Sequence, residues 1–297
     1  MKKKSLSVIA GLLLITFSSP VMAHMLWVNL NECYTHPPGH VLLSLGWGHS
    51  VPLDDLLASS SGTVHLASYA LIDPDGNKTD LGLPSKIEGE PIEAKGDLKI
   101  EPGNLGIRKL SLTKETKPGT WQAVATSKEN FFTKYIDKKG RQRMAQKSMD
   151  QITNANQILV SMKHLAFAKS FTAVQEWTPP KPLGYELELM PMTDLSNVHV
   201  GDLVSFRVTF MGKPVVTSPK NLRYLTATSN SFGGPDGFFI GAYIMNGKAQ
   251  FRIPAAGQWV ANVYVKQDVT PESYLKNLVG KCTTVYYAGT ISFNVKP

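Results

Sequence analysis

Short runs in which apolar and polar residues alternate recur along most of the chain. Alternation with a period of two is typical of strands that bury one face. Turn residues separate the runs, for example Asp73-Pro74-Asp75-Gly76 and Met211-Gly212-Lys213-Pro214. Many short strands at this spacing indicate β-sandwiches rather than a parallel sheet. We expect strands at 41–47, 64–72, 105–112, 120–126, 204–210, 249–253, 259–265 and 283–295.

Two further segments carry local signals of their structure. Asn246-Gly247, between FFIGAYIM and KAQFRI, predicts a two-residue hairpin turn, because both residues tolerate a positive φ. The segment NANQILVSMKHLAFAK (154–169) fits a helix or a long strand, and its periodicity does not distinguish them.

An internal repeat indicates how the strands are organised. LSLTKETKPGTWQAVA (110–125) and AQFRIPAAGQWVANV (249–263) share an alternating strand, a proline-containing turn, Gly-x-Trp and a second alternating strand. Each copy fits one hairpin of a separate sandwich, although a coincidence over so short a match is the alternative. The stretch around 178–182, rich in proline and lysine, fits a semi-rigid connector. We therefore expect an all-β protein with two immunoglobulin-like β-sandwich domains, 24–178 and 179–297.

The first 23 residues fit a secretory signal peptide. Lys2, Lys3 and Lys4 precede an apolar stretch at 8–17, and Val21-Met22-Ala23 is a typical cleavage site. An uncleaved membrane anchor is the alternative, but the apolar stretch is shorter than a membrane span requires. We expect a periplasmic protein that begins at His24 after cleavage.

The net charge says little about a binding partner, and the two cysteines suggest a disulfide. The formal charge of +8 falls to +5 when the three lysines of the first segment are removed, which gives no indication of a nucleic-acid partner. The basic stretch KYIDKKGRQRMAQK (134–147) is interpreted as a solvated loop rather than a binding surface.

Cys33 and Cys282 are the only cysteines. In an oxidising compartment they predict one disulfide between the chain ends, with buried thiols or a thiolate ligand as alternatives.

Five of the seven histidines lie near the expected new terminus. A histidine-dense segment in an exported protein suggests a site for nickel, cobalt, copper or zinc, although any single histidine is more commonly a surface residue. His65 alternates with Ala67 and Tyr69, which favours a packed core position for it. The two histidines that bracket Pro37-Pro38-Gly39 form a more exposed candidate pair. The candidate metal ligands are His24, His36, His40, His49 and His65; His164 and His199 are interpreted as structural.

His24 differs from the others because cleavage would give it a free α-amine. An α-amine and its own imidazole can close a chelate ring on one metal ion, and one more histidine would complete a planar nitrogen set. His49, in GWGHSVPLDD, is the expected partner, and Asp54 or Asp55 could bind the metal or orient His49. The alternatives are that His24 merely begins a strand and that Asp54 caps a helix.

Other chemistries have little support in the sequence. The chain contains no HExxH zinc motif, no GxSxG nucleophile motif and no phosphate-binding glycine loop. We therefore expect a binding protein and not an enzyme.

Several motifs together resemble a known family. AHMLWVNL, GWGHSVPLDD, YELELMPMTDL, IPAAGQWVANVYVK and YYAGTISFNV are similar to a family of exported bacterial proteins whose domain of unknown function is often described as a periplasmic component of nickel or cobalt transport. The resemblance implies two β-sandwich modules, the second transthyretin-like, and an accessory role in divalent-metal uptake. It favours His24 and His49 as the site. The basic stretch and the cysteine pair depart from that family's pattern.

Three hypotheses follow. The first is an exported protein that captures nickel or cobalt, with copper as an alternative, and passes it to a membrane transporter. The second is a structural or adhesive sandwich protein without a metal. The third is a copper-charged N-terminal histidine brace that oxidises a polymer, for which Trp27 and Trp47 could supply an aromatic face.

Overall fold

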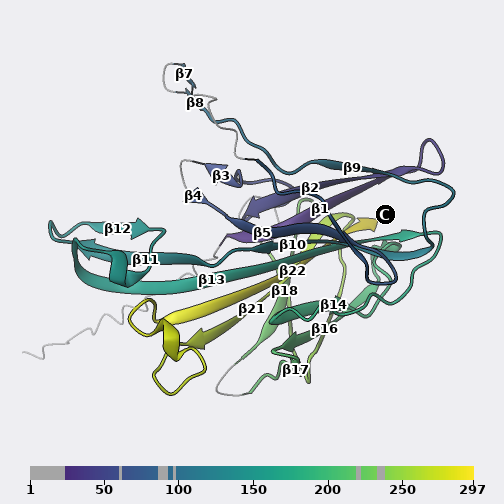
Figure 1. Cartoon of the computed structure of the whole chain (residues 1–297). Helices are drawn as coiled ribbons and strands as arrows, with labels where there is room; N and C mark the ends of the chain where they lie inside the picture. Colours follow the sequence, from purple (N-terminus) through teal and green to yellow (C-terminus); the bar gives the residue numbers. More distant parts are fainter. Residues whose placement is uncertain (1–23, 60–61, 86–92, 96–97, 219–221, 233–237) are drawn as a thin grey trace, which may run out of the picture.

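The computed structural model shows a protein built from β-strands in three layers (Figure 1). It describes residues 24–59, 62–85, 93–95, 98–218, 222–232 and 238–297. The expected signal peptide, 1–23, therefore lies outside the described residues. Within these ranges the two helices are short 3-10 turns, η1 (Met149–Gln151) and η2 (Lys276–Leu278), and no helix is long and apolar enough to span a membrane.

The middle layer is one large sheet. Its main path runs in the order β19-β18-β21-β22-β13-β10-β5-β6, and β11, β12 and β15 pair at its margins. The strands are β5 (Leu66–Ile72), β6 (Lys78–Asp80), β10 (Gly119–Ser127), β11 (Asn130–Asp137), β12 (Gln142–Ala145), β13 (Ala155–Val174), β15 (Val198–His199), β18 (Tyr224–Ser229), β19 (Ile240–Tyr243), β21 (Gly257–Asp268) and β22 (Thr284–Lys296).

Two smaller sheets cover opposite faces of the middle sheet (Figure 1). One contains β1 (Met25–Cys33), β2 (His40–Gly48) and β9 (Arg108–Ser111); the other contains β14 (Leu187–Pro191), β16 (Leu203–Phe210), β17 (Lys213–Pro214) and β20 (Lys248–Arg252). Two short hairpins, β3 (Ala58–Ser59) with β4 (Gly62–Thr63) and β7 (Glu93–Lys95) with β8 (Leu98–Ile100), are separate.

Side-chain alternation along β13 supplies both interfaces between layers. Ala166 and Ala168 belong to the apolar core under β1 and β2, whereas Phe167 and Phe171 belong to the larger core under β14 and β16. Successive residues of a strand point to opposite faces, so one long strand can serve two cores. The small alanines allow β1 to pack closely on one side of the middle sheet.

Lys169 is a buried cation on the second of these faces. Its ammonium contacts the Glu188 carboxylate, and both side chains are almost completely buried. Glu188 also accepts backbone N–H bonds from Leu183, Gly184 and Tyr185, at 2.8, 2.7 and 3.1 Å. Burial lowers the pKa of Lys169, and Glu188 opposes that shift. The pair fixes the start of β14 against β13, because either charge would be expensive to bury alone.

The repeat expected from the sequence has matching local geometry. Gly119 and Gly257 both have a positive φ at the start of a strand, 118° and 122°. Trp121 and Trp259 each donate an indole N–H to the carbonyl four residues earlier, at 3.0 and 2.9 Å. The two strands that follow, β10 and β21, flank the parallel pair β13–β22 in the same sheet. The sheet thus runs across the expected domain boundary, which itself stays a prediction.

The strand predictions are confirmed. The undecided segment 154–169 is also a strand, and the basic stretch expected to be a loop is a hairpin. All eight expected segments contain strands, and 154–169 lies almost entirely in the strand β13. Asn246 and Gly247 form the expected turn, with φ of 51° and 73°, although β19 and β20 continue into different sheets. The basic stretch 134–147, expected to be a loop, is mostly the hairpin β11–β12.

The expected disulfide is not present: Cys33 and Cys282 are both free thiols. The register of β1 against β22 explains why. Thr290 and Asn294 donate side-chain hydrogen bonds to the carbonyls of Leu26 and Leu30, at 2.6 and 2.8 Å. This register places Cys33 just past the last residue of β22, whereas Cys282 precedes its first residue. A 13-residue strand is about 40 Å long, and a disulfide requires Cα atoms within about 7 Å.

Candidate metal centre

His24 and His49 lie together at the open end of the β1–β2 hairpin. The last residue pair of the hairpin is Met25 with Gly48, so the next residue on each strand is a histidine. The two imidazole centroids are 4.4 Å apart, and the ring planes are inclined by 48°. The antiparallel register therefore brings together two of the histidines proposed from the sequence, although 24 positions separate them in the chain.

A short loop folds back under His49 and positions a carboxylate beside it. Asp55 donates its backbone N–H to the Trp47 carbonyl at 2.9 Å, which closes the loop at its base. The His49 backbone N–H donates to Oδ2 of Asp54 at 2.7 Å, and Nδ1 of His49 lies 3.3 Å from the same oxygen. Gly48 has a φ of 127°, and a Cβ there would overlap the Asp54 side chain. Asp54 thus orients His49, and no helix follows it to be capped.

Trp27 and Asn29 anchor the same loop to β1. The Trp27 indole N–H donates to Oδ1 of Asn29 at 2.8 Å and to the Pro52 carbonyl at 3.2 Å. The Asn29 amide also donates to the Pro52 carbonyl, at 3.0 Å. Gly46 makes room for the buried indole, since a Cβ at that position would overlap the Trp27 ring. Buried polar groups are normally hydrogen-bonded, and these bonds hold the loop against β1.

Trp47 forms the inner wall of the centre, and His164 lies behind it. The Trp47 ring is 5.2 Å from the His24 ring and 6.5 Å from the His164 ring, centroid to centroid. His164, on β13, is buried, and its Nε2 atom has no hydrogen-bond partner. The sequence predicts a structural role for this histidine and gives no sign of its closeness to His24. Only the register of β13 would have made that connection.

The electrostatics favour a neutral imidazole at His24. Burial lowers its pKa, and the neighbouring His49 lowers it further, while Asp55 and Asp54 oppose the shift. Burial, with a smaller contribution from His24, lowers the pKa of His164 to about 4. A metal ion binds the unprotonated nitrogen, so a depressed pKa reduces competition from protons at neutral pH.

The donor chemistry of the pair fits a transition-metal ion. A carboxylate next to Nδ1 of His49 directs the ring lone pair to Nε2, as carboxylate partners of metal-binding histidines do. Within the ranges that the structure describes, no three His, Cys, Asp or Glu side chains are grouped closely enough to hold a metal ion. At this point the described side chains bring together two imidazoles, those of His24 and His49.

The other candidate histidines lie elsewhere. Cys33 pairs with His40 at the far end of the β1–β2 hairpin, so His40 and His36 are roughly 27 Å from His24 by strand geometry. His65 precedes β5 and is exposed, so the packed core position expected for it is wrong. The pairing of β5 with β10 shifts register between Leu66 and Ser68, so the alternation changes phase there: Leu66 is buried on one side of the shift and Tyr69 on the other, and His65 is left exposed. None of these three joins the His24–His49 pair.

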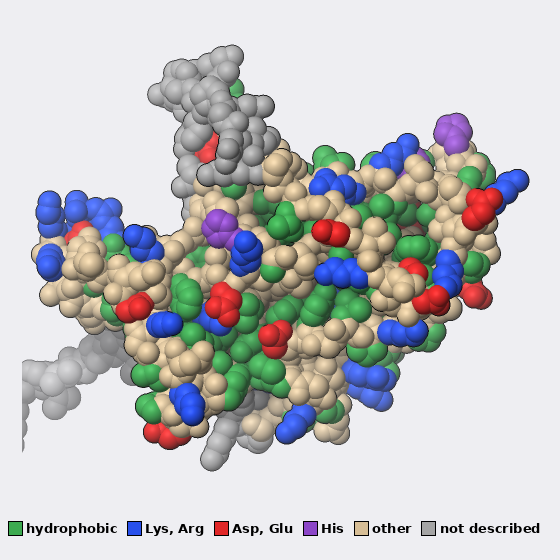
Figure 2. All heavy atoms as spheres, viewed as in Figure 1, with side chains coloured by type: hydrophobic (Ala, Val, Ile, Leu, Met, Phe, Trp, Pro, Cys, Tyr) green, Lys and Arg blue, Asp and Glu red, His purple; other side chains and the backbone are tan. Residues whose placement is uncertain are grey.

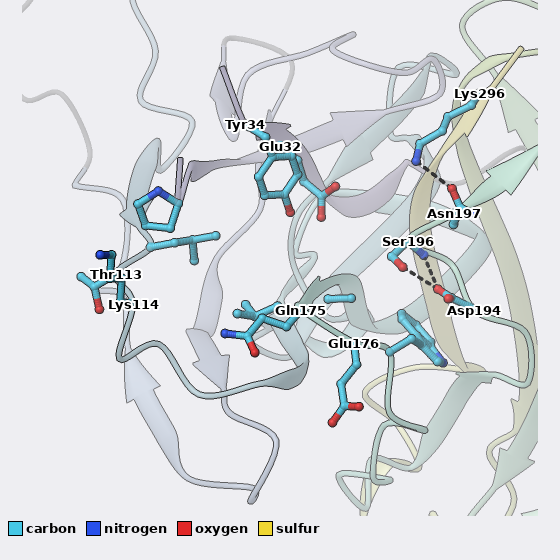
Figure 3. A pocket seen from close by; sticks show the side chains of 15 residues that line it. Glu32, Tyr34, Thr113, Lys114, Gln175, Glu176, Asp194, Ser196, Asn197 and Lys296 are labelled. Carbon is cyan, nitrogen blue, oxygen red and sulfur yellow. Dashed lines mark hydrogen bonds between the residues drawn. The ribbon is translucent and has the colours of Figure 1, made fainter. Parts of the chain in front are cut away.

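A separate polar hollow of about 610 Å³ lies at that far end of β1 (Figure 3). Glu32, Tyr34, Glu176 and Asp194 line it, together with Lys296. Two of its polar pairs are closed within the protein: the Ser196 hydroxyl donates to Asp194 at 2.6 Å, and the Lys296 ammonium donates to Asn197 at 2.9 Å. The hollow contains no histidine, so we assign it no part in metal binding.

Fold and site together define a β-sheet protein with a histidine pair at the start of its first described strand. The chain belongs to the family with the domain of unknown function DUF4198, whose sequence model matches residues 21–267. The matched region includes His24, His49 and His164 and ends within β21. No curated protein matches the chain.

Proposed function

We propose that this protein binds a divalent transition-metal ion through His24 and His49 and serves as an accessory component of metal uptake. The observation that carries the proposal is the 4.4 Å approach of the two imidazoles, with Asp54 beside the second. In the proposed form, the signal peptide directs export to the periplasm, and cleavage after Ala23 frees the α-amine of His24. The amine and two imidazoles then give three nitrogen ligands.

Nickel and cobalt are the metals that the family resemblance implies, and a membrane transporter is the proposed recipient. Three nitrogen ligands of this kind also suit copper(II), which binds nitrogen donors more strongly than nickel or cobalt in the usual order of affinities. Copper bound in an N-terminal histidine brace is therefore the second candidate. In both cases we propose a binding protein and not an enzyme.

We also propose that the strands form two β-sandwiches, the second transthyretin-like. Two separate apolar cores support this description. One lies between β1–β2 and the middle sheet, and the other lies between β14–β16 and the opposite face of that sheet. The matched Gly-x-Trp turns fit one copy of the same unit in each half.

Calorimetric titration tests the histidine pair. Nickel(II), cobalt(II) and copper(II) are titrated separately into protein that begins at His24, into its His49→Ala variant and into a matched His65→Ala variant. We expect one-to-one binding in the first, a loss of about a hundred-fold or more in His49→Ala, and no change in His65→Ala. Equal affinities in all three proteins would contradict the proposal, and the order of the three metals identifies the cargo.

A further inference from the structure

Part of the middle sheet extends beyond both outer sheets as a three-stranded arm. It consists of β11, β12 and the first part of β13, residues 155–162, and it projects to one side of the molecule in Figure 1. β11 pairs with β12 on one side and with β13 on the other. Continuous antiparallel pairing makes the arm an ordered element and not the solvated loop that its composition predicts.

The tip of the arm is strongly basic. Lys and Arg side chains gather there in Figure 2. Between residues 130 and 147 there are six basic residues and a single acidic one, Asp137. The basic residues are Lys134, Lys138, Lys139, Arg141, Arg143 and Lys147.

The carboxylate of Asp137 is hydrogen-bonded by groups of the arm itself. Asp137 accepts backbone N–H bonds from Lys139 and Arg141, both at 2.9 Å, and its other oxygen lies 3.1 and 3.3 Å from Nε of Arg141 and Arg143. These bonds lower the pKa of Asp137 to about 2. The carboxylate therefore fixes the turn and holds two guanidinium groups in place, while the lysines around it remain exposed to solvent.

Exposed apolar side chains lie among these charges. Met144 is opposite Lys134 on the neighbouring strand, and Lys134 is opposite Val160 on the next. Residues paired across strands share a face of the sheet, so the three side chains form one row. Met144 is 66% exposed and Val160 is 41% exposed. A basic rim around exposed apolar residues is typical of surfaces that lie in the headgroup region of a membrane.

The same face leads to the candidate metal centre. On β11 and β13, Lys134 is paired with Val160, Phe132 with Met162, and Asn130 with His164. These pairs alternate along one face of the sheet, and the Phe132 ring lies 6.5 Å from the His164 ring, behind Trp47. By strand geometry the turn at the tip is about 25 Å from His164.

We propose that the arm docks on a bilayer of anionic phospholipid. Phosphate headgroups complement the basic tip, Met144 and Val160 enter the headgroup–acyl boundary, and about 25 Å of strand separates the docked tip from His164, behind the candidate metal centre. A bilayer is favoured over an acidic protein because the apolar row protrudes between the charges. This docking is independent of the proposed metal binding.

Vesicle co-sedimentation tests the docking in the presence of a chelator, so that failure cannot arise from the metal site. Protein that begins at His24, where the described structure starts, is mixed with vesicles of phosphatidylglycerol and phosphatidylcholine in equal parts, or of phosphatidylcholine alone. The test variant carries Lys138→Gln, Lys139→Gln and Lys147→Gln. The matched control carries Lys213→Gln, Lys248→Gln and Lys276→Gln, which are exposed lysines outside the arm.

We expect salt-sensitive binding to the anionic vesicles and little to the neutral ones. The arm variant is expected to bind about a hundred-fold more weakly, because each of the three lysines near an anionic surface contributes roughly a five-fold factor. The control variant should bind like the wild type, and Met144→Ser should show a smaller loss. Equal binding to both vesicle types, or equal binding by the arm and control variants, would overturn the proposal. An absence of vesicle binding would also overturn it and would leave an acidic protein as the partner.

Discussion

Replacing His164 with leucine is expected to stabilise the protein, most strongly in acid. The native imidazole is buried with an unpartnered Nε2 atom. Leaving a buried polar atom without a hydrogen bond costs about 1–3 kcal/mol. Leucine has a similar size and no such atom, so His164→Leu is expected to unfold at a urea concentration equal to or higher than that of the wild type at pH 7.

The pH dependence gives a sharper test. Burial lowers the His164 pKa from its ordinary value of 6.5 to about 4. Above pH 6.5 the ring is neutral in both the folded and the unfolded chain, so the protonation of His164 takes nothing from the free energy of unfolding. As the pH falls from 6.5 to 4, the unfolded chain binds the proton first and stability is lost. One pKa unit corresponds to about 1.4 kcal/mol, so this loss reaches about 3 kcal/mol.

Urea unfolding followed by tryptophan fluorescence, at a series of pH values from 7.5 to 4, measures both effects. His164→Leu should lack this part of the acid destabilisation, whereas the exposed control His65→Leu should follow the wild type. Parallel stability curves for His164→Leu and the wild type would refute the reasoning, as would a loss of more than about 2 kcal/mol at pH 7. Metal affinity should be unchanged, because His164 is not among the proposed ligands.

Three further substitutions test separate parts of the structure. Lys169→Met leaves the Glu188 carboxylate buried without its cation and is expected to lower the free energy of unfolding by about 3–5 kcal/mol. Lys163→Met, whose partner Glu129 is exposed, should cost less than about 1 kcal/mol; equal losses in urea unfolding would contradict this account. Asp54→Asn should weaken metal binding about ten-fold or more in calorimetry, because Asp54 orients His49; the control Asp80→Asn should not. Gly46→Ala should destabilise by about 1–3 kcal/mol in thermal or urea unfolding, since its Cβ would overlap Trp27, while Gly241→Ala, with space around it, should not.

Much of the strand pattern was predictable, because alternation is a local property of the sequence. The run at 41–47 and the Asn246-Gly247 turn are each determined by residues close together in the chain. The pairing of β13 with β22 was not predictable, since more than 100 residues separate their partners. The register of β1 against β22 places Cys33 and Cys282 at opposite ends of β22, which explains why counting cysteines predicts a bond that the fold does not form.

In the candidate site, too, local sequence signals were readable and long-range strand pairing was not. His24 and His49 were identified from the sequence because a cleavage site and a glycine-flanked strand end mark them locally. His164 was missed because nothing near it in the chain indicates metal chemistry, and only the sheet brings it behind Trp47. The basic stretch was detected by its composition but interpreted as a loop, because its strands are defined by pairing with β13.

The central claim is that the backbone nitrogen of His24 is a metal ligand. The most direct measurement compares nickel(II) binding by protein that begins at His24 with binding by protein that retains Ala23, under identical calorimetric conditions. We expect tight one-to-one binding by the first and a loss of about a hundred-fold or more in the second, because an amide nitrogen replaces the amine. Equal affinity in the two proteins would contradict the claim and place the metal away from the start of β1.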